Sequence, residues 1–208
     1  MKVVSPSFEL LNYTAFPAQA VEIAARNCYK SEDRIAPGTA EDMVRRLGLK
    51  EHTPMWEFAT ATVRFVVDRG VSHELVRHRL ASYAQESTRY CNYGKGQFGS
   101  ELTFIRPCFW PPESDAYLMW CDAMRYAESM YMQMLQTGAT AQEARSVLPC
   151  STKTEVIMST NFREWYHVFS QRTTPAAHPQ MREVMIPCLR EFIRLWPEFF
   201  EYLREHTT

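Results

Sequence analysis

The chain has 208 residues, 46% of them hydrophobic, and its formal net charge is −1. A chain of this length and composition buries a sizeable core, so we expect a single domain over residues 1–208, with two small domains as the alternative. The near-neutral charge excludes a general electrostatic attraction to polyanionic DNA or RNA.

The six cysteines are scattered without a CxxC pair, which is typical of reduced thiols in a cytosolic protein. The first residues, MKVVSPSFEL, contain no basic-then-apolar leader. Apolar runs also stay far below the ~20 residues that a membrane-spanning helix needs. These features predict a soluble cytoplasmic protein that does not interact with a membrane.

Hydrophobic periodicity predicts mostly helices with a few strands between them. In chain order the patterns predict a helix over 16–31, a helix over 39–48, a strand over 59–68, a helix over 72–78, a strand over 101–107, a helix over 114–136, a helix over 140–149, a strand over 151–160, a helix over 161–172 and a helical segment over 179–206. Because the strands do not alternate regularly with helices, we expect an α+β fold: a mostly antiparallel sheet flanked by helices.

Helix boundaries are predicted from capping residues and prolines. Ser72 and Ser114 suit the N-cap positions of two helices. Thr39 with Asp42, and Thr140 with Glu143, have the spacing of a capping box, and Gly48 and Gly138 suit helix ends. In the C-terminal segment, Pro187 and Pro197 predict a break or kink.

Three motif matches fail on their context. GKGQFG (94–99) fits G-x-G-x-x-G, but a strand-like segment follows it where a dinucleotide site needs a helix, so we expect a mobile loop. His73 and His78 in HELVRH lie five positions apart and diverge by about 140° on a helix, so no metal site follows. Ser87 lacks the G-x-S-x-G context of a hydrolase nucleophile.

One motif is specific. RHRLASYAQES places Arg77, His78 and Arg79 seven residues before Ser87. This RHR-x7-S pattern resembles the signature of the flavin-dependent thymidylate synthases. The segments EHTPMWE, EARSVLP and NFREWYHVFSQR also resemble segments of that family, so the similarity extends over about residues 20–190. The resemblance implies a fold of the thymidylate-synthase-complementing-protein type.

The resemblance implies reductive methylation of dUMP to dTMP. Methylenetetrahydrofolate would donate the one-carbon unit and leave as tetrahydrofolate, FAD would carry the hydride and NADPH would be the reductant. Cofactor chemistry of this kind leaves orientation and electrostatics to the protein. The family also implies a homotetramer with active sites shared between subunits.

The resemblance assigns residues as follows. Arg172, which would stabilise negative charge on the uracil ring, and His52, near the flavin and folate, are implied to be catalytic. The implied flavin-binding residues are Arg77, His78, Arg79, Gln85, Asn161, Phe162, Arg163 and His167. The implied dUMP-binding residues are Glu74, Leu75, Val76, Arg77, Gln85, Glu86, Ser87, Thr88, Arg89, Arg145 and Arg172.

The residue types agree with these ligands. A nucleoside monophosphate is a dianion that carries a flat ring, and guanidinium forks suit both phosphate and ring edges. Of the 23 basic residues, 18 are Arg, although a single Arg outside the motif is more often part of a surface ion pair. Trp56, Trp165 and Tyr166 are expected to pack in the core.

Several positions depart from the family pattern and put single contacts in question. They are Pro54, Phe58, Glu74, Gln85 and His167. At Gln85 the family commonly has an acid, which here appears one place later at Glu86.

Two other functions stay open from the sequence. A non-catalytic protein that holds a nucleotide or short RNA would need a basic stripe with exposed aromatic residues, and the neutral charge disfavours it. A flavoprotein that reduces a different pyrimidine or a pterin is the other alternative.

Overall fold

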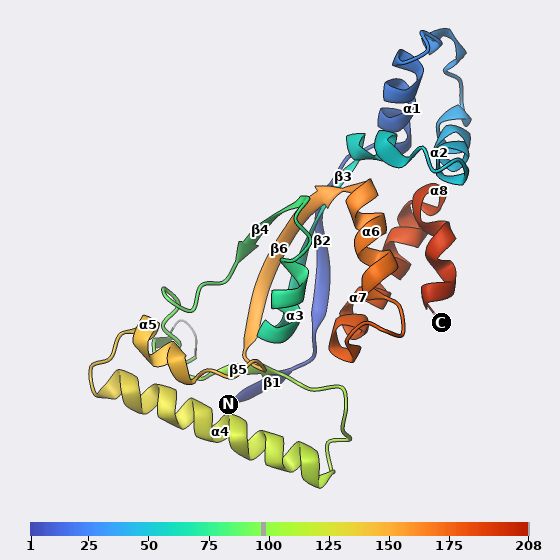
Figure 1. Cartoon of the computed structure of the whole chain (residues 1–208). Coiled ribbons are helices and arrows are strands. Elements are labelled where there is room, and N and C mark those ends of the chain that lie inside the picture. Colours follow the sequence, from blue (N-terminus) through green and yellow to red (C-terminus); the bar gives the residue numbers. More distant parts are fainter. Residues whose placement is uncertain (97–98, 208) are drawn as a thin grey trace. The chain divides into compact units, whose positions relative to one another are not determined.

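The structure, a computed structural model, describes residues 1–96 and 99–207 (Figure 1). In chain order its elements are β1 (Lys2–Val4), β2 (Ser7–Tyr13), α1 (Pro17–Asn27), η1 (Glu32–Arg34), α2 (Thr39–Leu49), η2 (Thr53–Phe58), β3 (Thr60–Asp68), α3 (Arg69–Leu75), β4 (Ala81–Gln85), β5 (Thr103–Ile105), α4 (Asp115–Gln136), α5 (Ala141–Ala144), η4 (Arg145–Val147), β6 (Lys153–Asn161), α6 (Phe162–Arg172), α7 (Pro179–Leu195), α8 (Pro197–Phe200) and η5 (Glu201–Thr207), where η denotes a 3-10 helix. The predicted loop at 94–99 includes residues 97–98, which lie outside the described residues.

A four-stranded sheet has the order β2-β3-β6-β4. Its first pair is antiparallel: the amide of Thr14 donates to the carbonyl of Thr60, and Glu9 forms an ion pair with Arg64. β1 and β5 form a separate parallel pair. The predicted α+β class, with a mostly antiparallel sheet flanked by helices, is confirmed.

The chain divides into two compact units, each described here by itself. The first comprises Met1–Ser7, Phe65–Arg77 and Ala84–Val156, and the second comprises Phe8–Arg64, His78–Tyr83 and Ile157–Thr208. The single domain expected over residues 1–208 stays a prediction.

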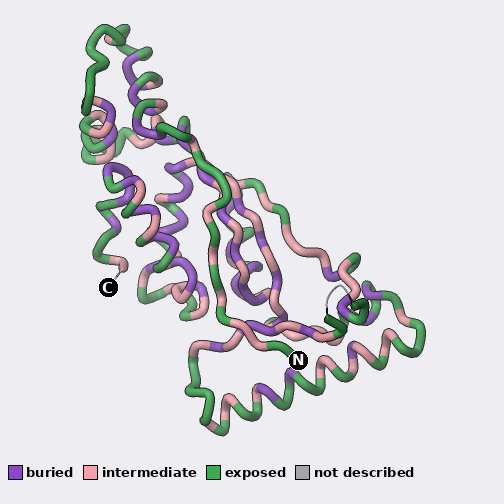
Figure 2. Tube along the Cα trace, turned by 180° about the vertical axis from the view of Figure 1, so that it is seen from behind, coloured by how far each residue is buried: buried purple, intermediate pink, exposed green. Residues whose placement is uncertain are grey.

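In the first unit, the long helix α4 runs alongside the β1–β5 pair (Figure 1). Met124 and Tyr131 of α4 pack with Phe104 of β5 and the neighbouring Leu102 in an apolar cluster. α4 buries few residues, as the alternating colours along it show (Figure 2). Its buried side is therefore a narrow stripe, the pattern of an amphipathic surface helix.

The second unit has an aromatic core. Phe162, Trp165 and Phe169 of α6 pack against Phe192 of α7 at ring-centroid distances of 5.0 to 6.2 Å. The indole of Trp165 donates to the carbonyl of Ala61 in β3 (3.1 Å), which fixes α6 against that strand. Trp56 and Trp165 are buried as expected, and Tyr166 packs edge-on against Trp56.

Two of the predicted helix caps are confirmed and two are wrong. Ser114 accepts a hydrogen bond from the third residue of α4, and Thr140 with Glu143 forms the capping box of α5. Ser72 does not cap its helix, because α3 begins earlier, at Arg69, and Asp68 accepts from the amide of Val71 (2.9 Å). A carboxylate at the last residue of β3 thus starts the helix one turn sooner than predicted.

The capping box predicted for Thr39 and Asp42 is also wrong. Thr39 is the first residue of α2 and its hydroxyl donates back to the carbonyl of Ala36, while Gly38, at φ +82°, stands at the N-cap. α2 runs one residue past Gly48. The break expected at Pro187 is absent because α7 continues through it, whereas α7 does end just before Pro197.

Within residues 1–96 and 99–207, no helix has the length and apolar character needed to cross a bilayer.

Candidate functional site

The RHR segment links α3 to β4. His78 is buried, with 5% of its surface exposed, whereas Arg77 and Arg79 on either side of it are exposed. The hydroxyl of Tyr83 donates to the carbonyl of His78 (2.7 Å). The imidazole is thus held inside, and the two guanidinium groups remain accessible to a ligand.

His78 contacts the end of α6. The Nε of Arg172 donates a hydrogen bond to Nε2 of His78 (3.0 Å). Burial, the charge of Arg172 and the nearby His167 lower the pKa of His78 to about 4, so the ring is neutral near pH 7. A neutral imidazole has one N–H, and a ring that accepts at Nε2 therefore carries its proton on Nδ1.

Helix α6 presents several of the predicted residues. Asn161 is its N-cap, with Oδ1 accepting from the amide of Glu164 (2.9 Å). His167 is exposed, and its ring lies 5.9 Å from that of His78. Arg163 is exposed and forms an ion pair with Glu57 (2.6 Å). The side chain of Phe162 is fully buried in the aromatic core. Its implied contact with the flavin stays a prediction, and the burial of this side chain does not support it.

Among the described residues, His78, Glu164 and His167 form the one group whose ligand atoms, all within 4.8 Å of one another, could hold a metal ion. Nε2 of His78 already accepts from Arg172, whose positive charge would repel a cation beside it. The group therefore suits a hydrogen-bonded cluster better than a metal centre.

A second set of predicted residues meets in the first unit. Nη1 of Arg145 donates to the hydroxyl of Thr88 (3.3 Å) beside a pocket of about 460 Å³. The residues that line this Arg145 pocket are Arg69, Thr88, Gln142, Arg145, Ser146 and Leu148. The lining contains two guanidinium groups and no carboxylate, so the pocket favours an anion.

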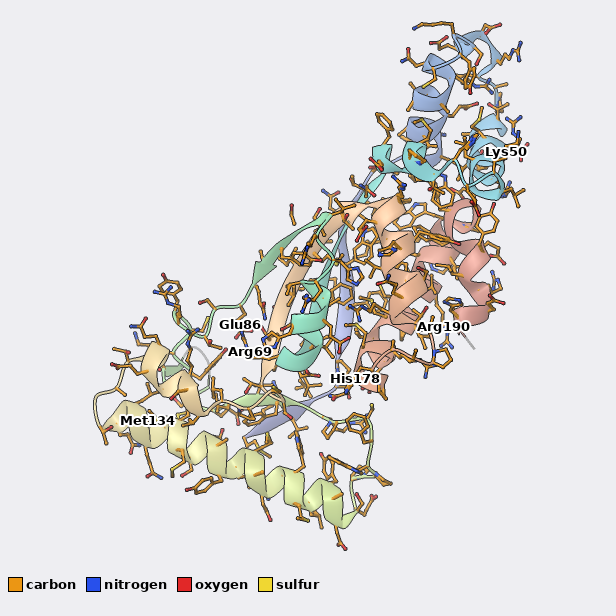
Figure 3. All side chains as sticks on the ribbon, viewed as in Figure 1. Lys50, Arg69, Glu86, Met134, His178 and Arg190 are labelled. Carbon is orange, nitrogen blue, oxygen red and sulfur yellow. The ribbon has the colours of Figure 1, made fainter. Side chains whose placement is uncertain are left out.

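Arg69, labelled at the start of α3 in Figure 3, strengthens this interpretation. Its Nη1 is shielded from solvent and has no acceptor among residues 1–96 and 99–207. A buried donor without an acceptor is costly, and an oxygen of a bound anion would satisfy it.

Gln85 and Glu86 have different environments. The amide nitrogen of Gln85 donates to the hydroxyls of Ser72 (3.0 Å) and Thr154 (3.2 Å) inside the first unit. Glu86, labelled just after β4 in Figure 3, accepts from Tyr93 (2.6 Å) and from Lys153 (3.0 Å). The charge of Glu86, the acid that follows Gln85, is thus balanced by a lysine.

The other predicted residues lie at three further places in the described parts of the chain: after β4, near η2 and at the end of α3. Ser87 accepts from the amide of Arg89 (3.3 Å), and the Arg89 guanidinium lies 5.3 Å from the Tyr90 ring centre. His52 is exposed in a separate, mostly apolar pocket of about 320 Å³ that Tyr29 and Met55 also line. At the end of α3, Leu75 is buried, Glu74 is half-buried and Val76 is exposed.

Three candidate functional residues were not predicted from the sequence: Arg69, Lys153 and Glu164. Glu164 stands three residues before His167, a helical spacing that places both on one face and could have indicated a shared site. No local signal marks Arg69 or Lys153, because each meets its partners only through the tertiary fold.

Comparisons with known proteins show the family of this chain. The family described as thymidylate synthase complementing protein matches residues 9–198. A flavin-dependent thymidylate synthase from Pyrococcus furiosus is 32% identical over 192 residues, covering 89% of this chain and 78% of the relative. A protein of the same name from Corynebacterium glutamicum is 30% identical over 195 residues, covering 86% of this chain and 77% of the relative.

A similar solved structure is that of the UMP/dUMP methylase PolB from Streptomyces cacaoi, bound with 5-Br dUMP. Its TM-score is 0.79 with 98% of this chain and 96% of that chain covered, and at 23% identity it shows a shared fold. Because it carries the RHR-x7-S motif and matches the family over residues 9–198, the chain belongs to the thymidylate synthase complementing proteins, the family of flavin-dependent thymidylate synthases.

Proposed function

We propose that this enzyme converts dUMP to dTMP by reductive methylation. The methylene group of methylenetetrahydrofolate and a hydride together form the new methyl group, tetrahydrofolate leaves, and NADPH is oxidised. The observation that carries the proposal is the 3.0 Å hydrogen bond from Arg172 to His78, which joins the end of α6 to the RHR segment.

Arg172 acts on the uracil ring. C5 of uracil is a weak nucleophile until electron density moves toward it, and negative charge then develops on the N3, O2 and O4 edge. A guanidinium already held in place by His78 stabilises that charge without reorganising during the reaction.

The Arg145 pocket takes the phosphate of dUMP. Arg145, Arg69 and the hydroxyl of Thr88 offer charged and neutral donors around one space, as a phosphate dianion needs. Ser87 and Arg89 follow β4 next to Thr88 in sequence and contribute to the same nucleotide. The unsatisfied Nη1 of Arg69 supports this role.

The donor set also fits FAD, which supplies hydride transfer when bound. Arg77, Arg79 and His167 are exposed, and guanidinium and imidazole groups suit a pyrophosphate and a flat ring. Asn161 uses its Oδ1 as a helix cap, so its amide N–H₂ group is the part that would donate to the ring. His52, beside its apolar pocket, would contact the folate.

A direct assay tests the function. Purified protein is expected to bind FAD and turn yellow, and with dUMP, methylenetetrahydrofolate, FAD and NADPH it is expected to form dTMP, measured by liquid chromatography. Flavin binding without dTMP would favour a different pyrimidine or pterin reduction. Absence of flavin binding together with salt-sensitive RNA binding would favour the non-catalytic alternative.

Assembly as a homotetramer with shared active sites is part of the proposal. Leu118, Met119 and Tyr126 on α4 are exposed apolar residues, and such residues are buried when copies of a chain associate. Sedimentation equilibrium is expected to give four chains per particle, and a stable monomer that retains full activity would refute shared sites.

A further inference from the structure

We propose that Glu164 is a positioning residue for Arg172 and acts on it through His78. The functional part of this inference rests on the proposed role of Arg172 in dTMP formation. The structural part, that Glu164 selects one tautomer of His78, stands independently of any activity.

The argument starts from the two nitrogens of His78. Nε2 accepts a hydrogen bond from Arg172 (3.0 Å), and Nδ1 lies 3.6 Å from Oε1 of Glu164. That separation leaves no room for an intervening water and is too long for a hydrogen bond, so the negative charge of the carboxylate acts on the ring through space. A carboxylate facing Nδ1 favours the tautomer with its proton there, which is the tautomer that leaves Nε2 free to accept from Arg172.

Burial makes this effect strong. Glu164 and His78 are only 7% and 5% exposed, and electrostatic interactions are weakly screened in such surroundings. In the other tautomer, an N–H on Nε2 would face the N–H of Arg172, donor against donor. Without Glu164 the imidazole can adopt that state, and the Nε of Arg172 then loses His78 as its acceptor.

The fold holds Glu164 in place separately from its side chain. Its backbone amide donates to Asn161 at the start of α6, so a substitution of the side chain leaves the helix cap intact. Tyr83 fixes the backbone of His78 through its carbonyl. The side-chain change therefore tests the tautomer rather than the position of either backbone.

The tautomer is measured by ¹⁵N NMR of histidine-labelled protein, in which the ring shifts distinguish an N–H on Nδ1 from one on Nε2. His78→Gln assigns the His78 signals among the six histidines of the chain. Wild type and Glu164→Gln, which keeps a neutral acceptor, are expected to show the Nδ1–H form. Glu164→Leu is expected to show a mixture, and the matched control Glu198→Leu, another buried glutamate, is expected to match wild type.

Activity supplies the second measurement. Glu164→Leu is expected to lower kcat on the order of 10- to 100-fold with little change in the KM for dUMP. Glu164→Gln is expected to keep most of the wild-type kcat. An unmixed Nδ1–H form in Glu164→Leu, or an unchanged kcat, would overturn the inference.

If Glu164→Leu does not fold, Arg172→Leu replaces it. Glu164 should then hold the Nδ1–H form of His78 alone, and a mixed tautomer in that variant would overturn the inference. A wild-type protein that makes no dTMP would refute the proposed function, while the NMR result would still decide whether Glu164 sets the tautomer.

Discussion

Replacing Arg172 by alanine is expected to lower kcat for dTMP formation by roughly 100- to 1000-fold, the usual cost of removing one preorganised donor to developing charge. Arg172 is half-buried and fixed by His78, so water cannot reproduce its position after truncation. The rate is measured as dTMP formed under saturating dUMP, folate, FAD and NADPH.

Arg194→Ala is the matched control, because Arg194 is an exposed arginine of the same unit that pairs with Glu191. It is expected to retain wild-type kcat. Full turnover by Arg172→Ala would remove Arg172 from the catalytic residues. Arg172→Lys separates charge from shape: a lysine keeps the charge but loses the planar fork, so only partial recovery is expected.

Replacing Arg145 by alanine is expected to weaken dUMP binding on the order of 10- to 100-fold, since a hydrogen bond to a charged group contributes about 1.5 to 3 kcal/mol. The Arg145 pocket would lose one of its two guanidinium groups. Titration calorimetry with dUMP measures the affinity.

Deoxyuridine provides the control ligand, because it lacks the phosphate that Arg145 is proposed to bind. Wild type and Arg145→Ala should bind it equally weakly. Arg125→Ala provides the control variant, since Arg125 is exposed on α4 and pairs with Asp122. If Arg145→Ala lost the same factor in affinity for dUMP and for deoxyuridine, Arg145 would be shown to shape the fold rather than to bind phosphate.

The long elements were predictable because their patterns are strong and local. α4 begins and ends where Ser114 and Gln136 predicted, since a capping residue and a glycine stop act within one helical turn. β3 and β6 were predicted because both are central in the sheet and bury alternate residues. In each case the side chains carry the periodicity of the element itself.

The elements that were missed depend on partners elsewhere in the chain. β2 and β4 are the outer strands of the sheet, with weak apolar alternation, and β1 is three residues long. Edge strands are stabilised by pairing on one side and need few buried side chains, so their sequences resemble loops. The cap predicted for α3 was wrong for a related reason. The preceding strand ends on Asp68, and the side chain of Asp68 caps the helix.

By itself, the sequence determined the family, because four residues at fixed spacing specify a motif without any knowledge of contacts. The arginines assigned to the ligands stay predictions. Only the tertiary structure decided that His78 is neutral and accepts from Arg172, that Glu164 faces its other nitrogen, and that Arg69 shares a pocket with Arg145. A pKa, a tautomer and an unsatisfied donor depend on burial and on neighbours that are distant in the chain. The local sequence predicts neither the burial of a residue nor its distant neighbours.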